Sequence, residues 1–70
     1  MLYVNIDGID DRQLEFCGYR LSFEGSNHKL YGDTHGGEHI VSNSPPRYLF
    51  VEDVNDADCL RANTILNIQP

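Results

Sequence analysis

The residues that could bind a metal gather in one short stretch of the chain. His35 and His39 are four residues apart, Glu38 adjoins His39, and His28 is nearby. On a helix this spacing places two imidazoles on one face, as in zinc sites. Two glycines between the histidines disfavour a helix, however, and a structural zinc site usually takes four ligands, often thiolates. We therefore expect these histidines to lie in a solvent-facing loop, with no metal or other cofactor.

The two cysteines, Cys17 and Cys59, are the candidate nucleophiles, and they lie far apart in the sequence. A thiolate can act as a nucleophile beside a histidine that a third group orients. No spacing in this chain requires such a dyad, and no serine lies in a G-x-S-x-G context. The pair could form one disulfide, but we favour two buried reduced thiols, which are common in cytosolic proteins. We predict that the chain is not an enzyme.

Acidic side chains are the most informative feature of the sequence. The formal net charge is −6, from 11 Asp and Glu against 5 Lys and Arg, and the acids form two clusters. Asp is a normal turn and cap residue, and near a helix N-terminus it stabilises by about 0.3–1 kcal/mol. The alternative interpretation is an anionic face that docks on a basic protein surface. The partner-binding residues that we predict are Asp7, Asp10, Asp11, Glu52, Asp53, Asp56 and Asp58.

The same charge argues against two classes of partner. A negative protein repels phosphate backbones and anionic membranes, and the five basic residues are scattered, so we expect no direct nucleic-acid binding. No stretch approaches the roughly 18 apolar residues of a membrane helix. The N-terminus lacks the basic region and long apolar run of a signal peptide, so we expect a cytoplasmic protein.

Alternating apolar residues predict the strands that must position these side chains. Residues 2–6 alternate cleanly, and residues 47–53 are apolar on both faces, which indicates a central strand. Further strands are expected at residues 19–24, 28–31, 39–41 and 64–68. The glycine-rich segment 32–37 is expected to be a flexible connection, and two prolines end the structure before residue 47.

Two helices are weighed against strands. Asp10 can cap a helical turn, with Gln13 three residues later and Gly18 as its stop. The alternative is one long strand bulged at Gly18, and we favour the helical turn. Near the C-terminus, Asn55 can cap a helix that starts at Asp56. Its later apolar residues do not share one face, so we end this helix near residue 62.

These elements predict a single α+β domain over residues 1–70. It has a small antiparallel or mixed sheet of about five strands and one or two short helices. If the first and last strands are neighbours, the two acidic clusters could merge into one face. A domain this small has little room for a deep cleft, which favours a binding surface over an active site.

Three functions follow from this interpretation. The first is a small inhibitor, of the phage anti-defence (anti-CRISPR) or immunity/antitoxin type, that docks on the basic, nucleic-acid-binding surface of a partner protein such as a nucleic-acid-processing enzyme. The second is a homo-oligomeric structural or assembly module that pairs through edge strands. The third is a small metal- or thiol-dependent enzyme using His35, Glu38, His39 or Cys17. We favour the first.

Overall fold

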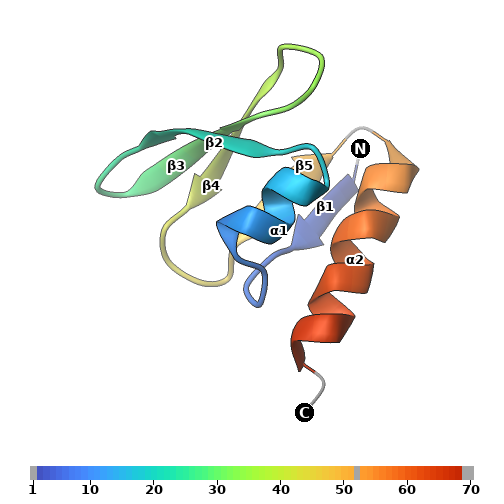
Figure 1. The fold of residues 1–70 in the computed structure, drawn as a ribbon. Coiled ribbons are helices and arrows are strands. Elements are labelled where there is room, and N and C mark those ends of the chain that lie inside the picture. The colour runs from blue at the N-terminus through green and yellow to red at the C-terminus, as the bar shows by residue number, and fades with distance from the viewer. Residues whose placement is uncertain (1, 52, 69–70) are drawn as a thin grey trace.

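The computed structural model describes residues 2–51 and 53–68, and the side chains of residues 2–51 and 53–62. Within these residues the chain forms two antiparallel sheets and two helices, a small α+β fold (Figure 1). The elements are β1 (Leu2–Asn5), α1 (Asp11–Phe16), β2 (Arg20–Glu24), β3 (His28–Gly32), β4 (Glu38–Ser42), β5 (Tyr48–Val51) and α2 (Val54–Ile68).

The strands divide between a two-stranded and a three-stranded sheet. Among the described strands, β1 pairs only with β5, with Leu2 opposite Val51 and Asn5 opposite Tyr48. β2, β3 and β4 form the second sheet in chain order. The prediction that residues 47–53 form a central strand is therefore wrong. β5 is apolar on both faces because one face enters the core, while Phe50 on the other face contacts the rings of Tyr3 and His39.

The helical turn before β2 is confirmed, and the bulged-strand alternative is wrong. The Asp10 carboxylate accepts a hydrogen bond from the Gln13 backbone N–H at 2.9 Å, and the Gln13 side chain accepts one from the Asp10 N–H at 3.0 Å. This reciprocal pair is a capping box. Gly18 follows with φ of +98°, a left-handed conformation that favours glycine, and it turns the chain from α1 into β2.

The second helix is longer than expected. Residues 64–68 continue α2 and do not form the predicted strand, and the helix begins at Val54, not Asp56. Asp53 occupies the cap position that we assigned to Asn55, since its carbonyl accepts the backbone N–H groups of Asp56 and Ala57. Helix propagation is cooperative once a first turn is fixed. Burial of Ala57 and Leu60 on one face fixes those first turns, so a mixed apolar pattern further along does not end the helix.

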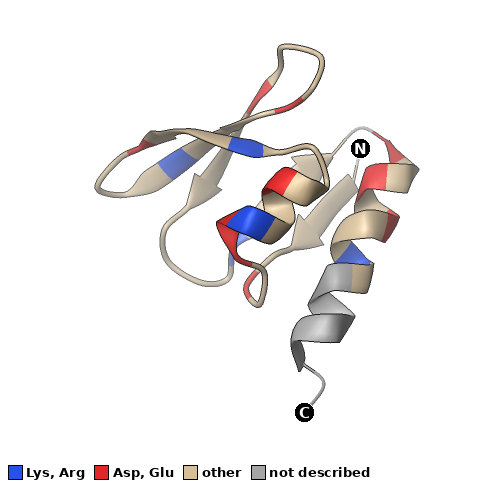
Figure 2. Cartoon of the chain, in the orientation of Figure 1, with Lys and Arg blue, Asp and Glu red and all other residues tan. Residues whose placement is uncertain are grey.

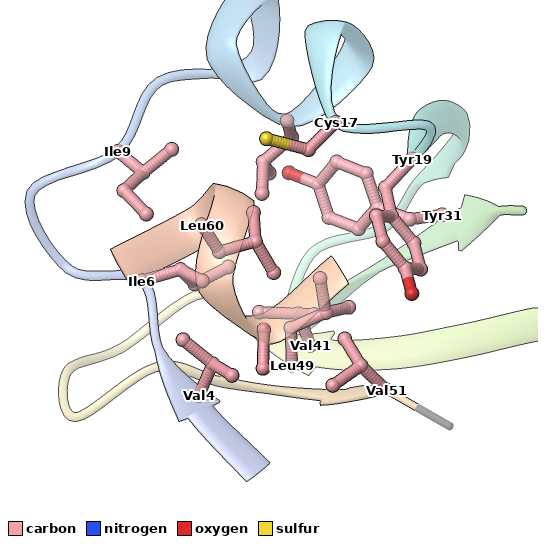
Figure 3. Close-up of a cluster of buried hydrophobic side chains, with 12 residues drawn as sticks. Val4, Ile6, Ile9, Cys17, Tyr19, Tyr31, Val41, Leu49, Val51 and Leu60 are labelled. Carbon is pink, nitrogen blue, oxygen red and sulfur yellow. The ribbon is translucent and has the colours of Figure 1, made fainter. Parts of the chain in front are cut away.

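A disulfide between Cys17 and Cys59 joins the end of α1 to α2, with Cα atoms 6.0 Å apart. The expectation of two reduced thiols is therefore wrong. The sequence distance between the cysteines concealed how closely α1 and α2 pack. Figure 3 shows the core around Cys17, where side chains from both helices and from β1, β3, β4 and β5 meet. Its buried members are Val4, Ile6, Ile9, Leu14, Cys17, Tyr19, Tyr31, Val41, Leu49, Val51, Ala57 and Leu60.

Candidate functional site: an acidic hollow

The loop between β3 and β4 is organised by Asp33. Its Oδ1 atom accepts hydrogen bonds from the backbone N–H groups of His35 and Gly37, each at 2.8 Å. Its own N–H donates to the Gly37 carbonyl at 3.0 Å. A Cβ atom at residue 37 would lie only 2.6 Å from Asp33 Oδ2, so any larger residue there would displace this carboxylate from its present position. The segment that we expected to be a flexible connection is a loop closed around one carboxylate.

His39 is the second partner of Asp33. Its Nε2 atom lies 2.8 Å from Asp33 Oδ2, and its side chain is buried. Its ring is nearly perpendicular to that of Tyr19, with centroids 5.2 Å apart, and stacks on that of Phe50 at 6.2 Å. The expectation that the histidines face solvent is thus wrong for His39, although His35 is exposed. The hydrogen bond from His39, followed by those from the backbone of His35 and Gly37, lowers the pKa of Asp33 to about 2.

The N-terminus of α2 supplies two more carboxylates. Asp53 Oδ1 accepts the backbone N–H of Asn55 at 2.8 Å. Asp56 Oδ2 accepts the hydroxyl of Tyr19 at 2.8 Å. Burial raises the pKa of Tyr19 well above its usual range, and the hydrogen bond to Asp56 and the negative charges of Asp56, Asp33 and Asp53 raise it further. Tyr19 therefore experiences the combined negative potential of three carboxylates drawn from two distant parts of the chain.

These groups surround a hollow of about 630 Å³, which we call the acidic hollow. One wall is the β3–β4 loop, another is the start of α2 with Asp53 before it, and the turn after α1 and the first residue of β1 complete the lining. Its lining residues are Leu2, Cys17, Gly18, Asp33, Thr34, His35, Asp53, Val54 and Asp56. Three of them are acids, and no described Lys or Arg lines the hollow. Such a recess suits a guanidinium or ammonium group, which carboxylates bind through charge-assisted hydrogen bonds.

The first predicted acidic cluster lies elsewhere and is engaged locally. Asp7 Oδ1 accepts the backbone N–H of Arg47 at 2.7 Å. Asp10 caps α1. Asp11 accepts the hydroxyl of Tyr31 at 2.6 Å, and its other oxygen lies 4.0 Å from Lys29 Nζ. These hydrogen bonds give each of the three carboxylates a structural role of the kind that turn and cap positions supply.

The second cluster is divided. Asp53 and Asp56 line the acidic hollow, whereas Asp58 pairs with Arg61 at 3.6 Å, and Glu52 lies outside the described residues. Figure 2 shows the acids at the start of α2 and those around α1 as separate groups. The two clusters do not merge as we anticipated, because residues 64–68 are helical. In addition, β1 pairs antiparallel with β5, so Asp7 and Asp53 follow opposite ends of that sheet.

Sequence reasoning missed Asp33 as a member of the site. A local signal was present, because an Asp followed by glycines often accepts hydrogen bonds from the backbone after it. No sequence pattern, however, indicated that this loop approaches α2.

Within the described residues, no set of three or more His, Cys, Asp or Glu is arranged to hold a metal ion. None of the described helices has both the length and the apolar character needed to cross a membrane. Comparison with known proteins finds no matching family model, no matching curated protein and no matching solved structure.

Proposed function

We propose that this protein is a small acidic inhibitor that docks on a basic surface of a partner protein, with the acidic hollow receiving a basic side chain of that partner. The observation that carries the proposal is the convergence of Asp33, Asp53 and Asp56 on one recess that no described Lys or Arg lines. Binding there would bring a positive charge to three carboxylates, none of which pairs with a described Lys or Arg, and complementary charges speed association and select partners.

Fewer residues contact the partner in this proposal than in the prediction from sequence. In this proposal the charges of Asp7, Asp10, Asp11 and Asp58 add to long-range attraction, while their hydrogen bonds and ion pairs support the fold locally. Asp53 and Asp56 are the members of the original set that we propose to touch the partner, with Asp33 added to them. Their carboxylates are held by Asn55, Tyr19 and His39, so little side-chain freedom is lost on binding.

The proposed partner is a nucleic-acid-processing enzyme, because such enzymes carry basic grooves for phosphate backbones. A protein of 70 residues with a net charge of −6 is suited to covering such a groove. This covers the phage anti-defence (anti-CRISPR) and immunity or antitoxin types of inhibitor, and it assigns the chain no reaction of its own. The alternative thiol enzyme needs Cys17 as a thiolate, whereas Cys17 is bonded to Cys59.

The test compares two double variants that remove the same charge. Asp53→Asn/Asp56→Asn changes the hollow, and Asp7→Asn/Asp10→Asn changes the other cluster while keeping groups that can accept the same hydrogen bonds. A partner is first identified by affinity capture with mass spectrometry, and its affinity for each variant is then measured at low salt and at about 0.15 M ionic strength. We expect the hollow variant to lose at least about tenfold more affinity than the other. Equal losses, or affinity that salt does not change, would contradict the proposal.

An assembly module is the second candidate, and one observation favours it. β1 is an edge strand of the two-stranded sheet, and Tyr3 on it is 65% exposed, with its ring 5.4 Å from that of Phe50. In this candidate, the edge strand β1 beside the exposed ring of Tyr3 pairs with a second copy. Light scattering over a wide concentration range tests this candidate, and a strict monomer would remove it.

A cytoplasmic location remains a proposal, and the disulfide weighs against it. Disulfides form and persist mainly in oxidising compartments. Blocking free thiols during extraction, followed by mass spectrometry of Cys17 and Cys59, measures the oxidised fraction in the cell. Two blocked thiols would favour the cytoplasm, and an intact disulfide would favour an oxidising compartment.

A further inference from the structure

The three-stranded sheet carries an apolar row on the face turned away from the core. Phe23 lies opposite Leu30, and Leu30 lies opposite Ile40, so the three side chains cross β2, β3 and β4 side by side. The neighbours Tyr31 and Val41 point the other way and are buried. Phe23 is 52% exposed and Ile40 is 69% exposed, while Leu30 between them is half-buried. The fold makes no use of this row in its core.

Phe23 is held in place although it is exposed. A β-bulge between Leu21 and Phe23 shifts the register of β2. The Phe23 ring lies over the backbone of Gly25, where an added Cβ would stand only 3.0 Å from the ring. The imidazole of His28 adjoins the same ring, with centroids 6.1 Å apart. An aromatic side chain fixed in this way loses little freedom when a partner covers it, which is the property of an interface anchor.

The charged residue beside the row that forms no ion pair with a described residue is acidic. Glu38 is exposed and lies on the same face as Ile40, two residues away. The exposed Glu24 adjoins Phe23 in β2, and its register with Lys29 places it on the opposite face of the sheet. Neither forms an ion pair with a described residue. Arg20 is on this face by its register with Gly32, but its Nε atom is paired with Glu15 at 3.3 Å. Apolar residues flanked by polar ones resemble the centre of a protein interface, and the carboxylate of Glu38 favours basic residues on the partner.

The size of the face distinguishes between two molecules that could cover it, a second copy of this chain and a short segment of another protein. Three strands of five residues, at about 3.3 Å per residue and about 4.8 Å between strands, span roughly 240 Å². A stable dimer interface takes about 800 Å² per partner, and two copies of a chain with net charge −6 repel each other. We propose that this face binds a short segment of a partner protein that alternates apolar and basic side chains. This inference rests on the proposed function, because it gives the partner an apolar contact in addition to the one at the acidic hollow. The two contacts are tested separately.

The experiment is a titration of the oxidised, isotope-labelled protein followed by NMR. The probes are three synthetic octapeptides: alternating Leu and Lys, alternating Leu and Glu, and alternating Ser and Lys. We expect the Leu–Lys peptide to give saturable shifts centred on Phe23, Leu30, Ile40 and Glu38. The Leu–Glu peptide should bind at least about tenfold more weakly than the Leu–Lys peptide, because Glu38 repels its acidic side chains. The Ser–Lys peptide should also bind at least about tenfold more weakly, because it lacks apolar side chains.

Matched variants separate this face from other exposed apolar groups. Phe23→Thr/Ile40→Thr keeps β-forming residues, and Tyr3→Thr/Phe16→Ser removes exposed aromatic groups away from the row. The first should weaken Leu–Lys binding at least about tenfold and the second less than about twofold, with unchanged thermal unfolding checked for both. Shifts centred on Tyr3 and Phe50 or on the acidic hollow would overturn the proposal. So would concentration-dependent shifts of Phe23 and Ile40 without peptide, which would identify a second copy as the occupant. If Asp53→Asn/Asp56→Asn caused no specific loss of partner affinity while the Leu–Lys peptide still bound this face, the proposed function would be refuted. The inference about the face would still hold.

Discussion

Reduction of the Cys17–Cys59 disulfide should bring this domain close to unfolding. The bond joins residues 42 positions apart. In the chain-entropy account, closing a loop of that size removes about 13 cal/mol/K from the unfolded chain, which corresponds to about 4 kcal/mol at 25 °C. A domain of this size is expected to have a total stability of only about 3–5 kcal/mol. One covalent bond therefore provides most of the margin between the folded and unfolded states.

The assay compares oxidised and reduced forms of the same chain by thermal unfolding and by denaturant titration, followed by circular dichroism. Reduction leaves every side chain in place, so no cavity contributes to the difference. For a domain of 60–100 residues, 1 kcal/mol shifts Tm by about 4–8 °C, and we expect Tm to fall by about 15–30 °C. The variant Cys17→Ala/Cys59→Ala serves as the control, because reductant should not change its Tm. A loss of less than about 1 kcal/mol on reduction would refute the reasoning, since the helices would then be held together by their other contacts.

Three further predictions concern single groups. Asp10→Ala should lower the free energy of unfolding by about 1 kcal/mol through loss of the α1 cap, whereas Asp10→Asn, which still caps, should change it by much less in the same denaturant titration. Gly37→Ala should lower Tm because its Cβ would meet Asp33 Oδ2. Gly32→Ala should lower Tm less, because the nearest atom to its Cβ would be 3.9 Å away. Equal decreases in Tm, measured by calorimetry, would show that the Asp33 loop is not tightly closed. The Asp33 contacts should persist at neutral pH and be lost as pH falls from about 4 toward 2. The reason is that the pKa of this carboxyl is lowered to about 2 in the folded chain, and the stabilisation disappears once the carboxyl is protonated. NMR shifts of the His35 and Gly37 amides measure this loss directly, and a transition centred near pH 4 would contradict the prediction.

Local signals predicted much of the fold. The capping box of Asp10 and Gln13, the turn at Gly18, and the strands around Leu21, Leu30 and Ile40 all depend on residues close together in the chain, and the structure places them as expected. Where prediction failed, a distant contact intervened. β5 was predicted to be central because both faces are apolar, but ring contacts with Tyr3 and His39 account for its outer face.

The sequence by itself determined that this is a small, strongly acidic α+β domain, and it located the acids at the starts of two helices. Only the tertiary structure decided that Cys17 bonds to Cys59, that His39 is buried against Asp33, and that Asp33 meets Asp53 and Asp56 around one hollow. The physical reason is the same in each case. Capping and alternation act between near neighbours and leave a pattern in the chain, whereas the packing of α2 against the end of α1 and beside the β3–β4 loop joins segments whose separation in sequence carries no such pattern.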